Sequence, residues 1–364
     1  MILRELSIIN FKNIAQSELS FSPKINCFIG NNGMGKTNVL DSIYYLSFCK
    51  SYINSVDSQI IKHGTDVCML QGKYLDEDDA KEEIYAGLKR RQKKQFKRNK
   101  KEYDRLSDHI GLIPLVMIAP QDVDLIIGGS DVRRRFMDIA ISQFDKEYLR
   151  CLVRYNKALQ QRNVLLKNGY ENVDFSLLEL WEDQLVSNGE LISNKRYEFI
   201  DNLTPIFNDF YSKISKLAEK VSLRYVSQLR EGDYRSMLLE NRTKDLALGH
   251  TTVGIHRDEL EMLLGDYPIK NVGSQGQNKT YFVSLKLAEF NYLKVTGDTM
   301  PILLLDDIFD RLDADRVSEI VKLVAGSDFG QIFLSDTNRG SLDKILDKVD
   351  DNYKIFSVVD GEVS

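Results

Sequence analysis

A glycine-rich stretch near the N-terminus has the spacing of a phosphate-binding loop. Residues 30–37 read GNNGMGKT and fit the pattern GxxxxGK[ST]. In this pattern glycines let backbone N–H groups surround phosphates, the lysine reaches the β- and γ-phosphates, and the hydroxyl binds Mg²⁺. We expect Lys36 to act in catalysis and Thr37 to bind the metal. The expected contacts to ATP come from Gly30, Asn31, Asn32, Gly33, Met34, Gly35, Lys36, Thr37 and Asn38.

An apolar segment that ends in two acids supplies the carboxylates that a phosphate-binding loop needs. Residues 302–307 read ILLLDD. We expect Asp306 to hold Mg²⁺ through its water shell, and Asp307 to orient or deprotonate an attacking water. The alternative is a strand-end turn whose two acids are simply solvated.

A second anion site is predicted at Ser274, Gln275, Gly276 and Gln277, just before a helix expected to start near Lys279. The first turn of a helix carries free N–H groups and the positive end of the helix dipole, which together favour anions.

Composition narrows the class of protein. The chain has 364 residues, of which 43% are apolar, and a formal net charge of −5. The longest uncharged apolar stretch, residues 111–120, is half the length that a bilayer crossing needs, and the first residues lack the regions of a signal peptide. We therefore expect a cytoplasmic protein without a membrane partner. Four cysteines without CxxC spacing predict reduced, buried thiols, and four histidines argue against a histidine-rich metal site.

Charged residues are distributed unevenly along the chain. An acidic run at residues 76–83 is followed by a basic run at residues 89–101. Basic residues in a row can follow a phosphate backbone and gain affinity by releasing counterions. The alternative is a hairpin whose charges keep a sheet edge soluble. The candidate DNA contacts in this run are Lys89, Arg91, Lys93, Lys94, Lys97 and Arg98.

The pattern of apolar residues predicts an α/β fold with a helical insertion. Strands are expected at 2–9 and 24–29, a helix at 38–48, an antiparallel meander at 67–75, 84–89 and 93–98, and a buried strand at 114–120. Long helices follow from about 131 to 225, and buried parallel strands at 301–305 and 331–334. We expect one discontinuous head from 1–125 and 250–364, with a mainly helical lobe at 126–249.

The order of these motifs resembles the RecF family of bacterial DNA replication and repair proteins, relatives of the SMC and Rad-type ATPase heads. Three further segments resemble family elements, and Ser-Gln-Gly-Gln at 274–277 is similar to the family's form of the ABC signature. The resemblance implies an ABC-type P-loop ATPase head: a mixed sheet with an antiparallel meander, plus the inserted lobe. The three segments are 10–13 (NFKN), 133–138 (RRRFMD, preceded by GGS at 128–130) and 254–258 (GIHRD).

The resemblance also assigns roles to single residues. Gln121 is similar to the Q-loop residue that reaches the metal or the attacking water, and Asp313 to the D-loop acid that crosses a dimer interface. Ser335-Asp336 stands where many ABC ATPases carry a histidine that contacts the γ-phosphate. The missing histidine and the short side chain of Asp307 predict slow hydrolysis. For His256 and Arg257, catalysis and a structural hydrogen-bonded turn remain alternatives.

The function implied by the resemblance is a nucleotide-switched DNA clamp. Two heads form a homodimer on ATP, with the loop of one and the signature of the other enclosing each nucleotide. The implied ligands are double-stranded DNA or single/double-strand junctions, and the implied partners are the mediators RecR and RecO, which help load RecA. Hydrolysis is expected to be stimulated by DNA. The alternatives are the nucleotide-binding subunit of a membrane transporter and a nucleotide-binding adaptor with negligible turnover.

Overall fold

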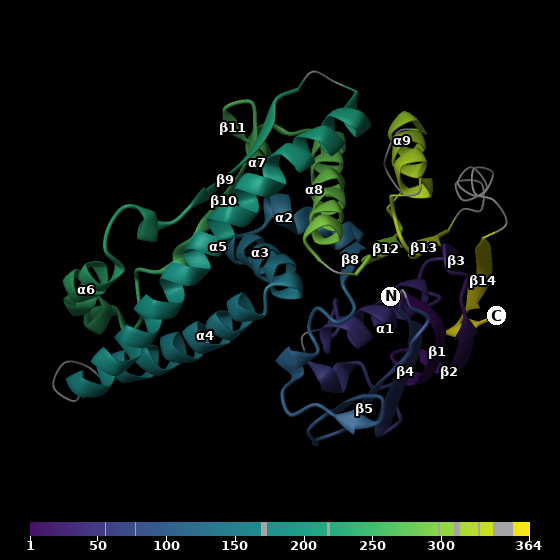
Figure 1. Cartoon of the computed structure of the whole chain (residues 1–364), viewed down its shortest axis with the longest axis horizontal. Helices are drawn as coiled ribbons and strands as arrows, with labels where there is room; N and C mark the ends of the chain where they lie inside the picture. The colour runs from purple at the N-terminus through teal and green to yellow at the C-terminus, as the bar shows by residue number, and fades with distance from the viewer. Residues whose placement is uncertain are drawn as a thin grey trace. The chain divides into compact units, whose positions relative to one another are not determined.

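The computed structural model describes residues 1–54, 56–76, 78–168, 173–216, 219–297, 299–308, 314–326, 328–337 and 352–364 (Figure 1). The chain divides into two compact units. The head unit comprises Met1–Asp122, Lys213–Lys216 and Lys279–Ser364, and the helical unit comprises Val123–Ser212 and Leu217–Asn278.

The second boundary of the helical unit differs from the expected one at 249/250. The structure groups residues 250–278 with the helical unit and not with the head. The reason is strand pairing, because β10 (Glu259–Leu264) pairs antiparallel with β9 (Val221–Val226) over their whole lengths. Such long-range pairing has no local signature in the sequence.

The head unit contains a mixed sheet with the strand order β15-β14-β3-β13-β12-β8. β14, β3, β13, β12 and β8 run parallel, and β15 pairs antiparallel with β14. The two predicted parallel strands are neighbours, with Leu303 opposite Ile332, and every residue of both is buried. The bounds are β3 Ile25–Ile29, β8 Leu115–Ile118, β12 Ile302–Asp306, β13 Ile332–Asp336, β14 Tyr353–Val359 and β15 Glu362–Val363.

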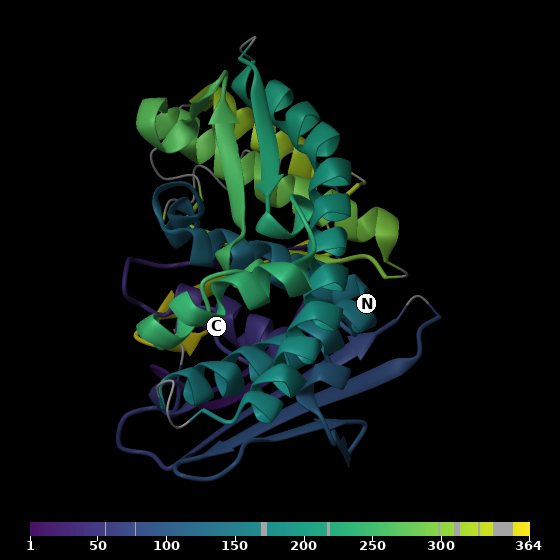
Figure 2. The same ribbon diagram turned by 90° about the vertical axis from the view of Figure 1, so that its left-hand side faces the viewer.

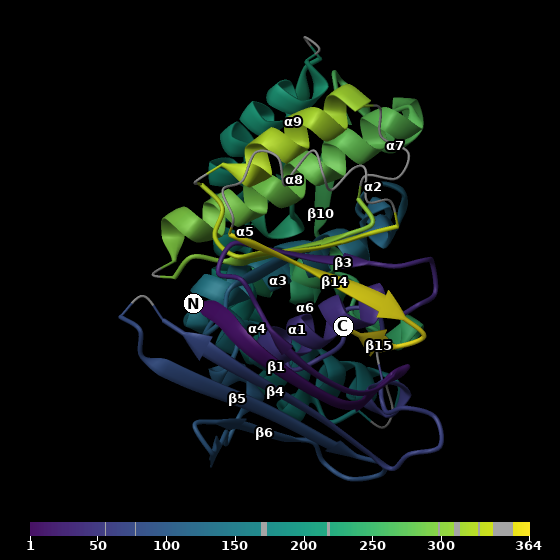
Figure 3. The same cartoon turned by 90° about the vertical axis from the view of Figure 1, so that its right-hand side faces the viewer.

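A second, antiparallel sheet in the head unit has the order β2-β1-β4-β5-β6-β7, and Figure 3 shows β1, β4, β5 and β6 side by side. Along β4 the even-numbered side chains are buried and the odd-numbered ones face outward, as expected for a sheet with one solvated face. The predicted meander is therefore confirmed. The bounds are β1 Ile2–Phe11, β2 Ile14–Ser20, β4 Val67–Leu75, β5 Lys81–Lys89, β6 Gln95–Arg98 and β7 Lys101–Glu102.

Helix α1 (Lys36–Phe48) lies between the two sheets and contacts β4 and β13. It has no polar stripe, and most of its side chains are buried, which fits a helix covered on all sides. Two further helices are described in the head, namely α8 (Gln275–Thr296), whose first residues belong to the helical unit, and α9 (Ala314–Ala325). Single 3₁₀ turns are η1 Asp57–Gln59, η2 Leu106–Asp108 and η3 Pro120–Val123.

The helical unit contains the long helices that the periodicity predicts. The longest, α5, runs for 41 residues from Phe175 to Ser215 and appears in teal in Figure 2. A small sheet with the order β11-β10-β9 completes the unit. The other bounds are α2 Asp124–Ile127, α3 Ser130–Phe144, α4 Lys146–Leu166, η5 Gln228–Arg230, α6 Tyr234–Leu248, η6 Ile255–Arg257, β11 Tyr267–Pro268 and α7 Ile269–Val272.

The cysteines agree with the prediction of reduced thiols. Cys27, Cys49, Cys68 and Cys151 are all free and buried. Burial raises the pKa of the Cys27 thiol to about 12, so this side chain is a packing group and not a nucleophile. Among the residues that the structure describes, no helix combines the length and apolar character needed to span a bilayer.

Candidate nucleotide-binding site

The phosphate-binding loop and the acid pair lie at one edge of the mixed sheet. The loop follows β3, Asp306 and Asp307 end β12, and β13 lies between these two strands. Because all three strands are parallel, their carboxyl ends meet at the same edge. The structure thus brings together residues that are about 270 positions apart in the sequence, as the hydrogen bond from Thr37 to Asp306 shows.

Two positions in the loop require glycine, one because of its backbone conformation and one because of a close backbone contact. Gly35, the residue before α1, has a φ of 114°, which side chains of L-residues rarely adopt. At Gly30, an added Cβ would lie 2.2 Å from the backbone oxygen of Val358 in β14. Larger residues at either position would displace the loop.

Asn13, just before β2, stabilises the loop through two side-chain hydrogen bonds. Its side-chain amide donates to the backbone oxygen of Met34 at 3.1 Å, and its oxygen accepts from Asn38 at 2.7 Å. The backbone N–H of Gly361, in the turn between β14 and β15, donates to the same Met34 oxygen at 2.9 Å. Asn13 belongs to the NFKN element, but the loop motif alone does not indicate this stabilising role.

The Lys36 ammonium lies inside the loop and is only 3% exposed. It donates to the backbone oxygens of Gly30 at 2.8 Å and Asn31 at 3.2 Å, and lies 4.0 Å from a carboxylate oxygen of Asp307. A buried ammonium needs such acceptors, and the phosphates of a nucleotide would be stronger ones.

Asp306 is at the centre of the acid pair. One of its oxygens accepts hydrogen bonds from the hydroxyls of Thr37 at 3.0 Å and Ser335 at 2.6 Å. Burial raises the pKa of the Asp306 carboxyl, and the two hydroxyl groups oppose that increase. A carboxylate and a hydroxyl side by side are hard oxygen ligands of the kind that Mg²⁺ prefers.

Asp307 is held in an unusual backbone conformation with a φ of 44°. Its N–H donates to the Ser335 side chain at 3.1 Å and to the Ser335 backbone oxygen at 3.3 Å. Its side chain is 26% exposed, whereas Asp306 is buried. Ser335 therefore orients both acids, a role that only the position of β13 between β3 and β12 reveals.

Gln121 lies in η3, directly after β8, and its side chain is exposed. Because β8 is parallel to β12, Gln121 follows a strand that ends at the same sheet edge. The neighbouring Asp122 is buried and accepts from the N–H of Ala119 at 2.7 Å and from the Tyr52 hydroxyl. Asp122 thus fixes the turn that carries Gln121, which the sequence did not predict.

The signature segment caps helix α8, and it belongs to the helical unit. The Ser274 hydroxyl accepts from the N–H of Gln277 at 3.2 Å, and the Gln277 side chain accepts from the N–H of Ser274 at 2.8 Å. This reciprocal pair is a capping box. It starts the helix at Gln275, four residues before the expected Lys279, and leaves the Ser274 and Gln275 side chains exposed.

His256 and Arg257 lie in a hydrogen-bonded turn of the helical unit. The Nε2 of His256 donates to the Thr251 backbone oxygen at 3.1 Å, and Nδ1 faces the Tyr155 hydroxyl at 2.9 Å. Arg257 donates to the same Thr251 oxygen. Burial lowers the pKa of His256 to about 4. These contacts favour the structural alternative for this pair.

Two sets of ion pairs lie at the segments 133–138 and 254–258, one around the buried Arg196 and one between Arg133 and Glu259. Arg196 of α5 bridges Asp138 at 2.8 Å and Asp258 at 2.7 Å. Arg133 is bound to both carboxylate oxygens of Glu259, at 2.6 and 2.8 Å. The family elements in this unit therefore hold α3, α5 and the turn before β10 together.

The basic run lies at the outer end of the antiparallel sheet. Two of its predicted DNA contacts form ion pairs inside the head: Lys94 with Asp57 at 2.9 Å and Arg98 with Glu82 at 2.5 Å. Of the remaining candidates, Lys97 is partly exposed and the others are exposed, namely Lys89, Arg91 and Lys93.

Asp313 lies outside the residues that the structure describes. Asp336 is buried at the end of β13, next to Ser335, at the expected position of the missing histidine.

Comparisons with known proteins agree with this architecture. The family described as RecF/RecN/SMC N terminal domain matches residues 2–364. The DNA replication and repair protein RecF of Phocaeicola vulgatus is 60% identical over 365 residues, covering 100% of this chain and 98% of the relative. RecF of Bacteroides thetaiotaomicron is 58% identical over 364 residues, with coverages of 100% and 98%.

Solved structures give the same result. A structure of the recombination mediator protein RecF-ATP in the RecFOR pathway has a TM-score of 0.89 and 29% identity, covering 100% of this chain and 97% of that one. The Smc head domain of Pyrococcus furiosus has a TM-score of 0.60 at 19% identity, with coverages of 100% and 95%, and shares the fold. The expected ATPase-head fold is confirmed, and the chain belongs to the RecF family of DNA replication and repair proteins.

Proposed function

We propose that this chain binds ATP and Mg²⁺ at the phosphate-binding loop and works as a DNA clamp in recombinational repair. The observation that carries the proposal is the Thr37–Asp306–Ser335 cluster beside Lys36. The solved RecF-ATP structure, similar over the full chain, supports ATP as the nucleotide. The comparisons favour neither the transporter subunit nor the adaptor without turnover.

The proposed metal position uses Thr37 and Asp306. Mg²⁺ is usually held by one or two carboxylates together with phosphate oxygens and water, and not by a cage of side chains. When bound, Mg²⁺ would neutralise charge on the β- and γ-phosphates.

Hydrolysis is proposed to depend on Asp307. Its partly exposed carboxylate lies beside the Lys36 ammonium, where it can accept a proton from an attacking water. Ser335 fixes its backbone, and Gln121 follows a neighbouring strand end from which it can reach the metal or the water. The short Asp307 side chain and the absence of a histidine at 335–336 support slow turnover, which DNA would accelerate.

The signature segment is proposed to act across a homodimer that forms on ATP. The side chains of Ser274 and Gln275 are exposed at the start of α8, where the N–H groups of a first helical turn can contact an anion. The capping pair uses the Ser274 hydroxyl as an acceptor for the N–H of Gln277 and leaves the Ser274 side chain exposed. In the dimer, each signature would contact the nucleotide of the opposite head, and Asp313 would lie at the interface.

The proposed ligands of the closed dimer are double-stranded DNA and single/double-strand junctions in the cytoplasm. The RecFOR pathway named for the similar solved structures supports RecR and RecO as mediator partners, with loading of RecA as the outcome. Turnover measured with and without DNA separates this proposal from an adaptor, because an adaptor would hydrolyse ATP at a negligible rate in both cases.

The direct test of the nucleotide site is calorimetric titration with MgATP. Lys36→Met should reduce affinity at least 100-fold, because the loop amides alone do not offset the charge of the phosphates. Lys354→Met, which removes an exposed lysine of the same unit, is the matched control and should bind like the parent. Near-parental affinity of a folded Lys36→Met protein would overturn the assignment of the site.

A further inference from the structure

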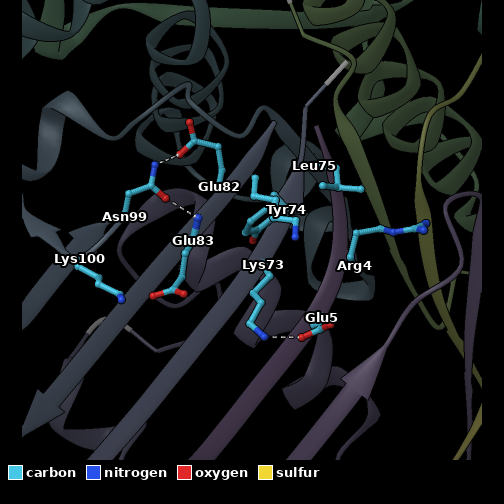
Figure 4. A pocket seen from close by; sticks show the side chains of 10 residues that line it. Arg4, Glu5, Lys73, Tyr74, Leu75, Glu82, Glu83, Asn99 and Lys100 are labelled. Atoms are coloured by element: carbon cyan, nitrogen blue, oxygen red, sulfur yellow. Dashed lines mark hydrogen bonds and ion pairs between the residues drawn. The ribbon is translucent and has the colours of Figure 1, made fainter. Parts of the chain in front are cut away.

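We propose that a groove on the head's antiparallel sheet is the phosphodiester-binding surface for DNA, and that Arg4, Lys81 and Lys100 contact the phosphates. This inference rests on the proposed DNA binding and names the surface that performs it. The groove has a volume of about 520 Å³ and is lined by residues of β1, β4 and β5 and of the β6–β7 turn (Figure 4).

A β-bulge places Arg4 in the groove. The register between β1 and β4 shifts between Leu3 and Glu5, so Arg4 is an extra residue without a partner in β4. A bulge redirects a side chain from the alternation of its strand. Arg4 and Glu5 are both exposed as a result, whereas Leu3 and Leu6 remain buried. Figure 4 shows Arg4 and Lys100 at opposite ends of the groove.

The acidic residues of the groove are largely occupied. Glu82 accepts from Arg98 and from Asn99, and the pKa of its carboxyl is lowered mainly by the bond from Arg98. Lys73 forms an ion pair with Glu5 at 2.6 Å and lies opposite Glu83 in the sheet register. The carboxylates therefore face cations of the protein itself.

The three remaining cations form no ion pair within the described residues. Arg4, Lys81 and Lys100 are all exposed, and Glu83 is the one lining carboxylate that forms no ion pair among those residues. Four of the lining residues are cations and three are carboxylates, an excess of one positive charge, and Arg98, which does not line the groove but pairs with Glu82, raises the local excess to two. The whole chain has a net charge of −5, so a local excess of this kind selects where a polyanion can bind.

The spacing of these cations suits a nucleic acid backbone. β1 and β5 are separated by β4, so Arg4 and Lys81 lie on strands roughly 10 Å apart, and the turn with Lys100 adds about one further strand spacing. A DNA strand presents one charge about every 3.4 Å along the axis. Three long side chains spread over roughly 15 Å can each reach a different phosphate.

The groove differs from the predicted set of DNA contacts within the basic run. Lys94 donates to the Cys49 backbone oxygen and pairs with Asp57, and Arg98 pairs with Glu82, so both cations already have partners within the head. Removing these two would damage packing in the head as well as change charge. A test of DNA binding should therefore leave Lys94 and Arg98 intact.

The test compares two variants with the same change in charge. The groove variant combines Arg4→Gln, Lys81→Gln and Lys100→Gln. The control variant combines Lys157→Gln, Lys167→Gln and Lys244→Gln, three exposed lysines of the helical unit. Fluorescence anisotropy with ATP measures affinity for a 30-bp duplex and for a duplex with a single-stranded tail between 50 and 200 mM salt.

The groove variant should lose about 100-fold in affinity near 0.1 M salt, and the slope of log affinity against log salt should fall by about 2.7, or 0.9 per lost contact. The control should bind DNA like the parent, and ATP affinity should be unchanged in both. If the groove variant binds DNA like the parent, the inference is wrong. The alternative partner of the groove would then be an acidic surface of another protein. Equal losses in both variants would overturn the inference too, because net charge would then be the cause. A parent that binds no DNA would instead overturn the proposed function itself.

Discussion

His256 provides a quantitative test of how the helical unit is held together. The pKa of this buried imidazole is lowered from 6.5 to about 4, mainly by burial. The Thr251 oxygen only accepts, so Nε2 carries the proton of the neutral ring and Nδ1 accepts from the Tyr155 hydroxyl. The folded protein thus keeps His256 neutral at pH values where the unfolded chain protonates it.

The sign and size of the effect follow from this difference. Above pH 6.5 both states are neutral at this position, and stability is unaffected. As the pH falls from 6.5 to 4, the unfolded chain takes up the proton first, so the free energy of unfolding decreases by about 3 kcal/mol. Below pH 4 both states are protonated, and the loss stops.

The assay uses the single tryptophan of the chain, Trp181, which lies in α5 of the helical unit. Urea unfolding followed by its fluorescence gives the free energy of unfolding of that unit at each pH. His256→Gln retains a donor and an acceptor but cannot titrate. The difference between parent and variant should change by about 3 kcal/mol from pH 7 to pH 4. His250→Gln, at an exposed position, is the control and should run parallel to the parent. Parallel curves for His256→Gln would refute the reasoning.

Three further changes test the site and the ion pairs of Arg196. Gly30→Ala should lower MgATP affinity at least tenfold, because the added methyl group meets a backbone oxygen of β14. Unchanged affinity would mean that β14 does not restrict the loop at this position. Arg196→Met should reduce the free energy of unfolding by about 3–5 kcal/mol, since it leaves Asp138 and Asp258 without their shared cation, and a loss below 1 kcal/mol would contradict this. Asp307→Asn should keep ATP affinity but slow hydrolysis by at least 100-fold. A parental rate would place the base elsewhere.

Local patterns predict most of the strands that carry the site. The GxxxxGK[ST] spacing and the apolar run before Asp306 each depend on consecutive residues. The strands predicted before them, β3 and β12, are confirmed. The bounds of β4 were also predicted, because its buried residues alternate regularly.

Contacts that depend on sheet order could not be predicted in this way. Ser335 reaches the acid pair only because β13 lies between β3 and β12, and Asn13 reaches the loop from the turn after β1. Lys94 pairs with Asp57 of η1, and Arg98 pairs with Glu82 of β5. Both ion pairs depend on where η1 and β5 lie in the fold. The early start of α8 has a local cause, because Ser274 and Gln277 cap each other in a pattern that the sequence contains.

ATP is proposed to join two heads, with the signature of each contacting the nucleotide of the opposite subunit. Ser274→Asp tests it, because aspartate is as good an N-cap as serine but places a negative charge beside the γ-phosphate. Sedimentation velocity with a slowly hydrolysed ATP analogue should show a dimer for the parent and a monomer for Ser274→Asp, with equal analogue affinity and equal thermal stability. A Ser274→Asp protein that still dimerises on the analogue would contradict the account and leave the segment as a helix cap alone.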